Sequence, residues 1–199
     1  FIDCMNYIKN NNYNKNICGA ILPKGHYKIT SQIPIYENIE IVGSRVGDPA
    51  GWHETSSFDN GSWLYIEVPA NSDDSTIAMR SGSAIRGVGI YYPTQQMGLT
   101  PLIFPPTFEV RGLNVKITDI VSVNSYELIK TMPESGAFYI SNIFGLALKT
   151  GFNVHWNTEY STIENVVFNA TFLRNIYTSE EIANTRTYIS NNANFISVE

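Results

Sequence analysis

The sequence predicts an all-β fold: a right-handed, single-stranded parallel β-helix (a solenoid) with a short capping helix at its N-terminus. Three observations lead to this prediction. Short strand-like segments separated by turn residues follow one another along most of the chain. A repeat of strands and asparagine turns returns in the second half. Charged residues make up only 16% of the 199 residues, below the roughly 25% of an average soluble domain, so neutral polar groups that suit sheets and turns must form the surface.

The N-terminal part of the chain alternates between apolar runs and turn residues. Residues 1–12 are expected to form the capping helix, because Phe1, Met5 and Ile8 recur at helical spacing. The asparagines that follow favour a turn and end the helix. Short strands bounded by Pro, Gly and Asn are then expected at residues 20–23, 26–30, 33–36, 39–43, 62–68 and 75–80.

Two stretches interrupt the strand pattern and predict loop excursions from the scaffold. Residues 44–62 are polar and rich in turn formers, and residues 93–106 contain four prolines. No flexible linker separates the strands, and both ends of the chain fall within apolar patterns. We therefore expect residues 1–199 to be a single β-helical segment of a longer protein.

Isoleucine anchors the repeat, and 23 residues separate Ile117 from Ile140 and Ile140 from Ile163. The anchors are Ile85, Ile117, Ile140, Ile163 and Ile189. The positions two residues after them hold Gly87, Asp119, Asn142, Asn165 and Asn191. Asn and Gly tolerate a left-handed backbone, and stacked Asn side chains can bond to one another. We expect an inward-facing isoleucine column beside a ladder of turn residues, with Asp119 a ladder member rather than a catalytic acid.

Leucine-rich repeats have a similar period, and they are the alternative fold. They need Leu at most anchors and a helical or irregular half-repeat. The anchors here are Ile, with Val and Phe at other apolar positions of the repeat, and no helical half-repeat is evident in the sequence. The period and the residue types together therefore favour the β-helix.

Several motifs resemble those of the pectate-lyase superfamily. FIDCMNYI followed by GAILPKGHYKIT is similar to the capping helix and first strands of these β-helices, and IEIVGS is similar to the next strand. GVGIYYPTQ and ALKTGFNVHWNTEYSTIENVVF resemble members found in phage tailspikes, tail fibres and secreted polysaccharide-degrading enzymes. The resemblance covers most of residues 1–172 and implies the fold. The aspartate sets of polygalacturonases and of calcium-binding pectate lyases are missing, so it implies no particular reaction.

Composition limits the partners and cofactors that we expect. The net charge is −5 and the pI is near 5.2, which does not suit a nucleic-acid-binding surface. No apolar run is long enough to insert into a membrane. No spacing of His, Asp or Glu predicts a metal site, and no motif indicates another cofactor. A surface rich in Asn, Ser and Thr suits the hydroxyl groups of sugars.

The first candidate site is the cluster Trp52, His53 and Glu54 on the loop at 44–62. A purely structural loop does not need an exposed Trp. The C–H faces of sugar rings stack on aromatic side chains, and carboxylates accept hydrogen bonds from sugar hydroxyls. Glycoside hydrolysis needs two carboxylates, so Glu54 is a candidate catalytic residue, with Trp52 and His53 as carbohydrate-binding residues. In the alternative, Trp52 folds back and seals the side of the solenoid.

The second candidate site is the cluster His155, Trp156 and Glu159, at a turn before the strand that contains Ile163. Glu159 is the candidate catalytic residue, and His155 and Trp156 are expected to bind carbohydrate. Elimination from a uronic acid would instead need a base, such as His, and a group that neutralises the sugar carboxylate. In the structural alternative, Trp156 packs on a neighbouring coil or subunit.

Tyr91 and Tyr92 form a third candidate for carbohydrate binding. Side chains alternate across a strand, so one of the two tyrosines should lie outside the solenoid. An outward tyrosine can contact either a sugar or a sister chain, and the sequence leaves both alternatives open.

These features predict an extracellular module of a phage tailspike or tail fibre, located in the virion tail. It would be a homotrimer that binds a bacterial cell-surface polysaccharide, with or without depolymerising it. The first alternative is a secreted bacterial polysaccharide lyase or glycoside hydrolase. The second alternative is a purely structural fibre of a virion or cell surface.

Overall fold

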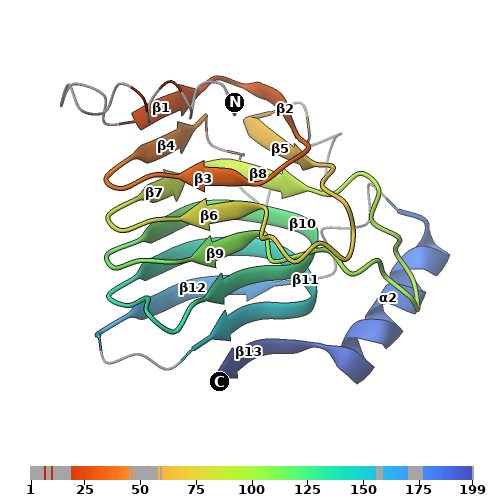
Figure 1. Cartoon of the computed structure of the whole chain (residues 1–199). Coiled ribbons are helices and arrows are strands. Elements are labelled where there is room, and N and C mark those ends of the chain that lie inside the picture. The colour runs from red at the N-terminus through yellow and green to blue at the C-terminus, as the bar shows by residue number, and fades with distance from the viewer. Residues whose placement is uncertain are drawn as a thin grey trace.

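The computed structural model describes residues 7, 10, 19–44, 46, 58, 60–155, 159–169 and 177–198. Thirteen strands in these ranges form one sheet, and the strands pair in parallel. The sheet curls around an apolar interior, and its strands stack from the N-terminal end to the C-terminal end (Figure 1). The predictions of a mainly β chain and of parallel strands are confirmed.

The strands form three hydrogen-bonded ladders, numbered in the order in which the chain visits them. The first ladder contains β1 (Gly19–Leu22), β4 (Glu40–Gly43), β7 (Ala84–Arg86), the beginnings of β10 (Lys116–Thr131) and β11 (Tyr139–Val154), and β12 (Thr162–Phe168). The second contains β2 (Gly25–Ile29), β5 (Ser62–Ile66), β8 (Val88–Tyr91) and the middle of β10 and β11. The third contains β3 (Ile33–Ile35), β6 (Ile77–Met79), β9 (Phe108–Val110), the ends of β10 and β11, and β13 (Asn194–Val198). We call one visit to all three ladders a pass.

The isoleucine column that the repeat predicts lies inside the first ladder. Ile85, Ile117, Ile140 and Ile163 are successive partners in parallel register, and Ile41 precedes them in the column. The side chains at 41, 85, 117 and 140 are fully buried, whereas Ile163 is half-buried near the C-terminal end. The 23-residue period is therefore the length of the two passes that start in the first ladder at Ile117 and at Ile140.

The turn ladder follows the isoleucine column at the corner between the first and second ladders. Gly87, Asp119, Asn142 and Asn165 have positive φ angles of 70°, 55°, 55° and 51°, the left-handed conformation that Gly, Asn and Asp adopt most easily. The Asn142 amide donates to the Asp119 carboxylate (3.0 Å), and the Asn165 amide donates to the Asn142 carbonyl (2.5 Å). Asp119 is a member of the ladder, as the sequence predicted.

The prediction that Ile189 and Asn191 form a fifth member of the repeat is wrong. Ile189 and Asn191 lie in helix α2 (Ser179–Asn192) and not in a strand of the first ladder. The helix begins with a capping box, in which the Thr178 hydroxyl accepts from the Glu181 N–H while the Glu181 carboxylate accepts from the Thr178 N–H. The chain completes its last pass with β13, which pairs with β11 in the third ladder.

Two parts of the predicted organisation fall wholly or mainly outside the described residues. Of the capping helix expected at residues 1–12, residues 7 and 10 are described, and both are helical. Of the excursion expected at 44–62, the loop residues at 45, 47–57 and 59 lie outside the described ranges. Residues 93–106 are described, and they run between β8 and β9 without a helix or strand.

A second, smaller core covers the outer face of the second ladder. Trp63, Val121 and Leu146 project outward from β5, β10 and β11 and are nevertheless buried. They pack with Ile182 of α2 in one cluster, and α2 lies along this side of the sheet (Figure 1). Gly89 lies opposite Trp63 in the ladder, and a Cβ at this position would lie 2.3 Å from the indole ring. The side chain of Trp63 therefore requires a glycine at position 89.

We predict that Ile140→Ala lowers the free energy of unfolding by about 2–5 kcal/mol, as truncations of buried isoleucine do. The reason is the cavity that it would leave within a fully buried column. Ile163→Ala is the matched control, because Ile163 occupies the same column but is half-buried, and its cost should be smaller. Urea denaturation followed by circular dichroism measures both values. Equal costs for the two variants would show that position 140 is no better packed than the end of the column.

We also predict that Asn142→Ala costs about 2–5 kcal/mol. The variant loses two side-chain hydrogen bonds, each worth about 0.5–1.5 kcal/mol, and it puts alanine, which lacks the local hydrogen bonding of an Asn side chain, in the left-handed region, at about 1–2 kcal/mol. Asn142→Gly removes the same hydrogen bonds but keeps a backbone that accepts positive φ. The glycine variant should therefore unfold at a denaturant concentration between those of the parent and the alanine variant. An alanine variant as stable as the glycine variant would contradict the role of the left-handed corner.

Candidate functional site

The structure places only some of the residues that the sequence singled out. Trp52, His53, Glu54 and Trp156 lie outside the described residues, so their predicted roles stay predictions. The four described candidates fall in two regions. Tyr91 and Tyr92 end the second ladder in the third pass, and His155 and Glu159 follow the third ladder in the fifth pass.

Tyr92 is buried inside the sheet, which contradicts the expectation that it contacts a saccharide. Its side chain is 0% exposed, and its hydroxyl lies 2.8 Å from Thr107 Oγ1 and 3.4 Å from Thr76 Oγ1. Burial raises the pKa of Tyr92 to about 12. The hydroxyl groups of Thr107 and Ser125 continue this network through the interior, so Tyr92 stabilises the core.

Tyr91 lies on the outer side, as strand alternation requires for one of the pair. Its ring packs at 4.6 Å from that of Phe58 and at 5.3 Å from that of Tyr65. It also hydrogen-bonds Tyr177, close to the start of α2, and burial is the main reason why the pKa of Tyr177 is raised. Tyr91 is partly buried in these contacts, and it links α2 and the aromatic cluster to the sheet.

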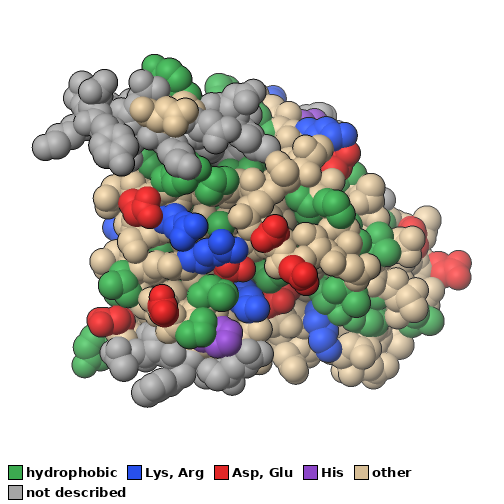
Figure 2. Space-filling view, in the orientation of Figure 1, with side chains coloured by type: hydrophobic (Ala, Val, Ile, Leu, Met, Phe, Trp, Pro, Cys, Tyr) green, Lys and Arg blue, Asp and Glu red, His purple; other side chains and the backbone are tan. Residues whose placement is uncertain are grey.

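A charged face, formed by Arg80, Glu109, Arg111, Lys130 and His155, lies on the outer side of the third ladder. Glu109 and Lys130 are direct partners in register, and both alternate with buried residues on β9 and β10. Figure 2 shows basic and acidic side chains gathered on this side, in front of β6 and β9.

Arg80, Arg111 and His155 directly follow the third-ladder strands of three different passes. The Arg80 N–H donates to Ile35 O (3.0 Å) and the Arg111 N–H donates to Met79 O (2.9 Å), so each residue continues the ladder by one position. The His155 N–H instead donates to a side chain of the neighbouring pass, the Thr131 hydroxyl (2.9 Å). Neighbouring strands lie about 4.8 Å apart, so this end of the ladder presents cationic or titratable groups at short intervals along the stack.

Ion pairing divides the charged face into a neutralised part and an available part. Arg111 pairs with Glu109, whose side chain is only 8% exposed, while the Arg111 side chain is 29% exposed. Neither Arg80 nor Lys130 pairs with a carboxylate among the residues that the structure describes. Arg80 is exposed and Lys130 is half-buried. The face therefore carries an excess of positive charge on a chain whose net charge is −5.

Glu159 lies at the corner beyond the charged face. It is exposed, and it packs against Gly136, where a Cβ would lie 2.7 Å from Glu159 Cβ. The turn that contains Gly136 also contains the exposed Glu134. The structure thus brings His155, Glu159 and Glu134 to one corner of the stack. His155 supplies an imidazole for proton transfer, and the two glutamates supply carboxylates at the same corner.

Sequence reasoning missed the basic residues of this face. Arg80, Arg111 and Lys130 come from three passes whose loops differ in length, so their positions do not repeat at a fixed interval in the sequence. The only local signal is alternation within each third-ladder strand, as in Glu109 and Arg111, which flank the buried Val110.

The structure also bears on metal and membrane binding. Within the described ranges, no three His, Cys, Asp or Glu side chains lie close enough together to hold a metal ion. In the same ranges, no helix has the length and apolar character needed to cross a membrane.

Comparisons with known proteins give no further identification. No protein-family model matches the chain, and no curated protein or solved structure is significantly similar to it.

Proposed function

We propose that this chain is a segment of a right-handed parallel β-helix that binds an acidic bacterial surface polysaccharide along the charged face of the third ladder. The observation that carries the proposal is the position of Arg80 and Lys130, which form no ion pair with any residue that the structure describes, beside Arg111 and His155 in consecutive passes. The parallel ladders and the 23-residue pass support the β-helix.

The chemistry of the face favours a carboxylated or sulfated sugar. Arginine binds carboxylates through two parallel hydrogen bonds, and lysine acts as a point charge. A single exposed ion pair contributes only about 0.2–1 kcal/mol, so useful affinity needs several such contacts with one polymer. The four groups come from four passes and span about 15 Å along the stack, which matches a few sugar rings of an extended chain.

A lyase is the second candidate function, and His155 is the specific residue that favours it. In an elimination, a base removes the proton next to the uronate carboxylate, and nearby cations stabilise the negative charge that develops. A C=C bond then forms as the glycosidic C–O bond breaks, and the leaving oxygen takes up a proton. His155 would be the base, and Lys130 and Arg111 would neutralise the carboxylate. In a hydrolase, Glu159 would instead be the general acid and Glu134 the second carboxylate.

The setting that we propose for this module is the tail of a phage, outside the cell. The resemblance of GVGIYYPTQ and of the segment from Ala147 to Phe168 to tailspike proteins supports this setting and a homotrimeric assembly. A secreted monomeric enzyme is the alternative setting for the lyase.

We predict that the double variant Arg80→Gln, Lys130→Gln binds an acidic capsular polysaccharide roughly 10-fold more weakly than the parent at low salt, since each lost contact is worth up to about 1 kcal/mol. Binding of the parent should weaken as salt is added, because the contacts are exposed. Isothermal titration calorimetry at two salt concentrations measures both effects.

The matched control is the double variant Lys24→Gln, Lys116→Gln. It removes the same charge from two exposed positions away from the third ladder, Lys24 in the bend between β1 and β2 and Lys116 on the first ladder, and it should bind like the parent. Equal losses in the two double variants would mean that total charge, and not the charged face, determines binding.

For the cleavage step, we predict that His155→Ala lowers the rate of polysaccharide cleavage by about 10²-fold or more while binding is kept, as loss of a positioned general base does. An unsaturated product, detected by its ultraviolet absorbance, identifies elimination, and reducing ends without unsaturation identify hydrolysis. Glu159→Gln separates the two mechanisms, because it should impair hydrolysis and leave elimination intact. A parent chain that binds polysaccharide without cleaving it would leave binding as the function, and one that does neither would favour a structural fibre.

A further inference from the structure

Glu109 lies in the middle of the charged face and is nearly buried there. It is the register partner of Ala78 on one side and of Lys130 on the other. It projects outward from β9, between the inward-facing Phe108 and Val110, and its side chain is nevertheless only 8% exposed. The neighbouring side chains of the charged face therefore cover most of the Glu109 side chain.

Glu109 holds the guanidinium of Arg111 in an ion pair. An arginine without such a partner can bind an acid group of a ligand through two parallel hydrogen bonds. Because Glu109 is nearly buried, salt screens this ion pair less than it screens an exposed pair. An acid group of a ligand therefore has to compete with Glu109 for the guanidinium, and Arg111 attracts it less than Arg80 or Lys130 does.

This ion pair determines the spacing of the cations that remain available on the face. Arg80 follows the third-ladder strand of the second pass, Arg111 follows that of the third pass, and Lys130 lies in that of the fourth. Arg80 and Lys130 form no ion pair with a carboxylate among the described residues. They are two passes apart, which is about 10 Å along the stack. An extended disaccharide has about this length, whereas neighbouring sugars of a polymer lie closer together.

We propose, on the basis of the binding function proposed above, that Glu109 selects a polysaccharide with one acid group in each disaccharide. Successive acid groups would contact Arg80 and Lys130, and the neutral sugar between them would lie over the pair of Arg111 and Glu109. A polymer with an acid group on every sugar would place one of these groups close to the Glu109 carboxylate. A like-charge contact of this kind rejects a competing ligand, so Glu109 is a specificity-determining residue of the charged face.

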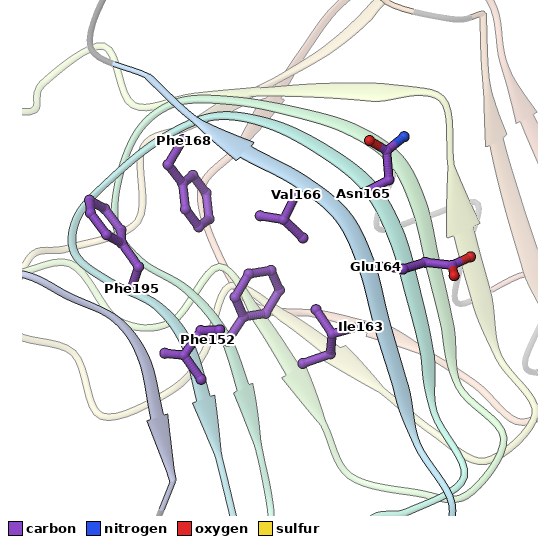
Figure 3. Close-up of a pocket in the computed structure, with 8 residues that line it drawn as sticks. Phe152, Ile163, Glu164, Asn165, Val166, Phe168 and Phe195 are labelled. Carbon is purple, nitrogen blue, oxygen red and sulfur yellow. The ribbon is translucent and has the colours of Figure 1, made fainter.

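An apolar cavity at the C-terminal end of the stack lacks this pattern of charges (Figure 3). It has a volume of about 380 Å³, and its lining includes Phe152, Phe168 and Ile196. Glu164 is the one charged residue among those that line it, and its side chain points away from the cavity in Figure 3. The cavity therefore offers no cation to an acidic polymer, in contrast to the charged face.

The test measures the affinity of the 199-residue chain for two probes by isothermal titration calorimetry at low salt. The probes are oligosaccharides of equal length, from hyaluronan, which has glucuronate at alternate sugars, and from polyglucuronate, which has it at every sugar. The parent should bind the hyaluronan probe more tightly, although the polyglucuronate probe carries more charge. Glu109→Gln keeps the shape of the side chain and releases Arg111, so it should bind the polyglucuronate probe about 5-fold more tightly, the factor for one exposed ion pair. Its affinity for the hyaluronan probe should change less.

Two further variants separate charge spacing from total charge. Glu40→Gln is the matched control, because Glu40 pairs with Arg86 on the first-ladder face, so the variant also releases an arginine but leaves the charged face intact. It should keep the parent's ratio of the two affinities. The double variant Glu109→Gln, Arg111→Gln removes the released arginine again, and it should lose the gain for polyglucuronate. Circular dichroism checks that each variant is folded.

Four results would overturn the proposal. Equal gains in Glu109→Gln and Glu40→Gln would show that net charge determines binding. A double variant that keeps the full gain would show that Arg111 is not the group that Glu109 controls. A parent that binds the polyglucuronate probe as tightly as the hyaluronan probe would remove the selection by spacing, while the proposed binding of an acidic polysaccharide would stand. Failure of both the parent and Glu109→Gln to bind either probe would overturn the proposed binding function as well.

Discussion

The left-handed corner two residues after Ile85, Ile117, Ile140 and Ile163 is the constraint on which the rest of the structure depends. Asp119, Asn142 and Asn165 turn the chain there, and their side chains bond directly between passes. A slip of one residue would turn the buried isoleucines to the solvent face and break the amide ladder at once. The corner and the isoleucine column therefore fix the same register of the first ladder. The strands of the other two ladders follow in the same passes, so their positions along the stack depend on this register.

The charged face is a consequence of that register. Arg80, Arg111 and Lys130 are far apart in sequence, and no local element brings them together. They become neighbours because β6, β9 and β10 are paired in parallel with fixed partners. Changes in the loops between the second and third ladders do not disturb this arrangement, since each strand end is held by its neighbours and not by the length of the loop that leads to it.

The sequence predicted the first ladder well but only the first two strands of the third ladder, β3 and β6, for a physical reason. The first-ladder strands that lead into the Asp119, Asn142 and Asn165 corners follow one another at intervals of 23 residues, so their isoleucines repeat visibly in the sequence. Insertions enter before the third ladder, as with the loop at 93–106 and with α2, and they remove any fixed period from its strands. One of these insertions, α2, also explains why Ile189 was wrongly assigned to a strand of the repeat. The sequence around Ile189 resembles the repeat motif, but it lies in a helix that begins with a capping box.

The three outer faces differ in what remains available to a partner. The second-ladder face is covered by α2 and by the cluster around Trp63. On the first-ladder face, charged groups bind to neighbours on the same face: Arg86 pairs with Glu40, and the Tyr139 hydroxyl donates to Glu164. This face keeps Lys116 as an exposed cation, but isolated exposed charges bind weakly. On the third-ladder face, cations from consecutive passes stand together without equal numbers of carboxylates. A polyanion laid along the stack would therefore find several partners on this face and few on the other two.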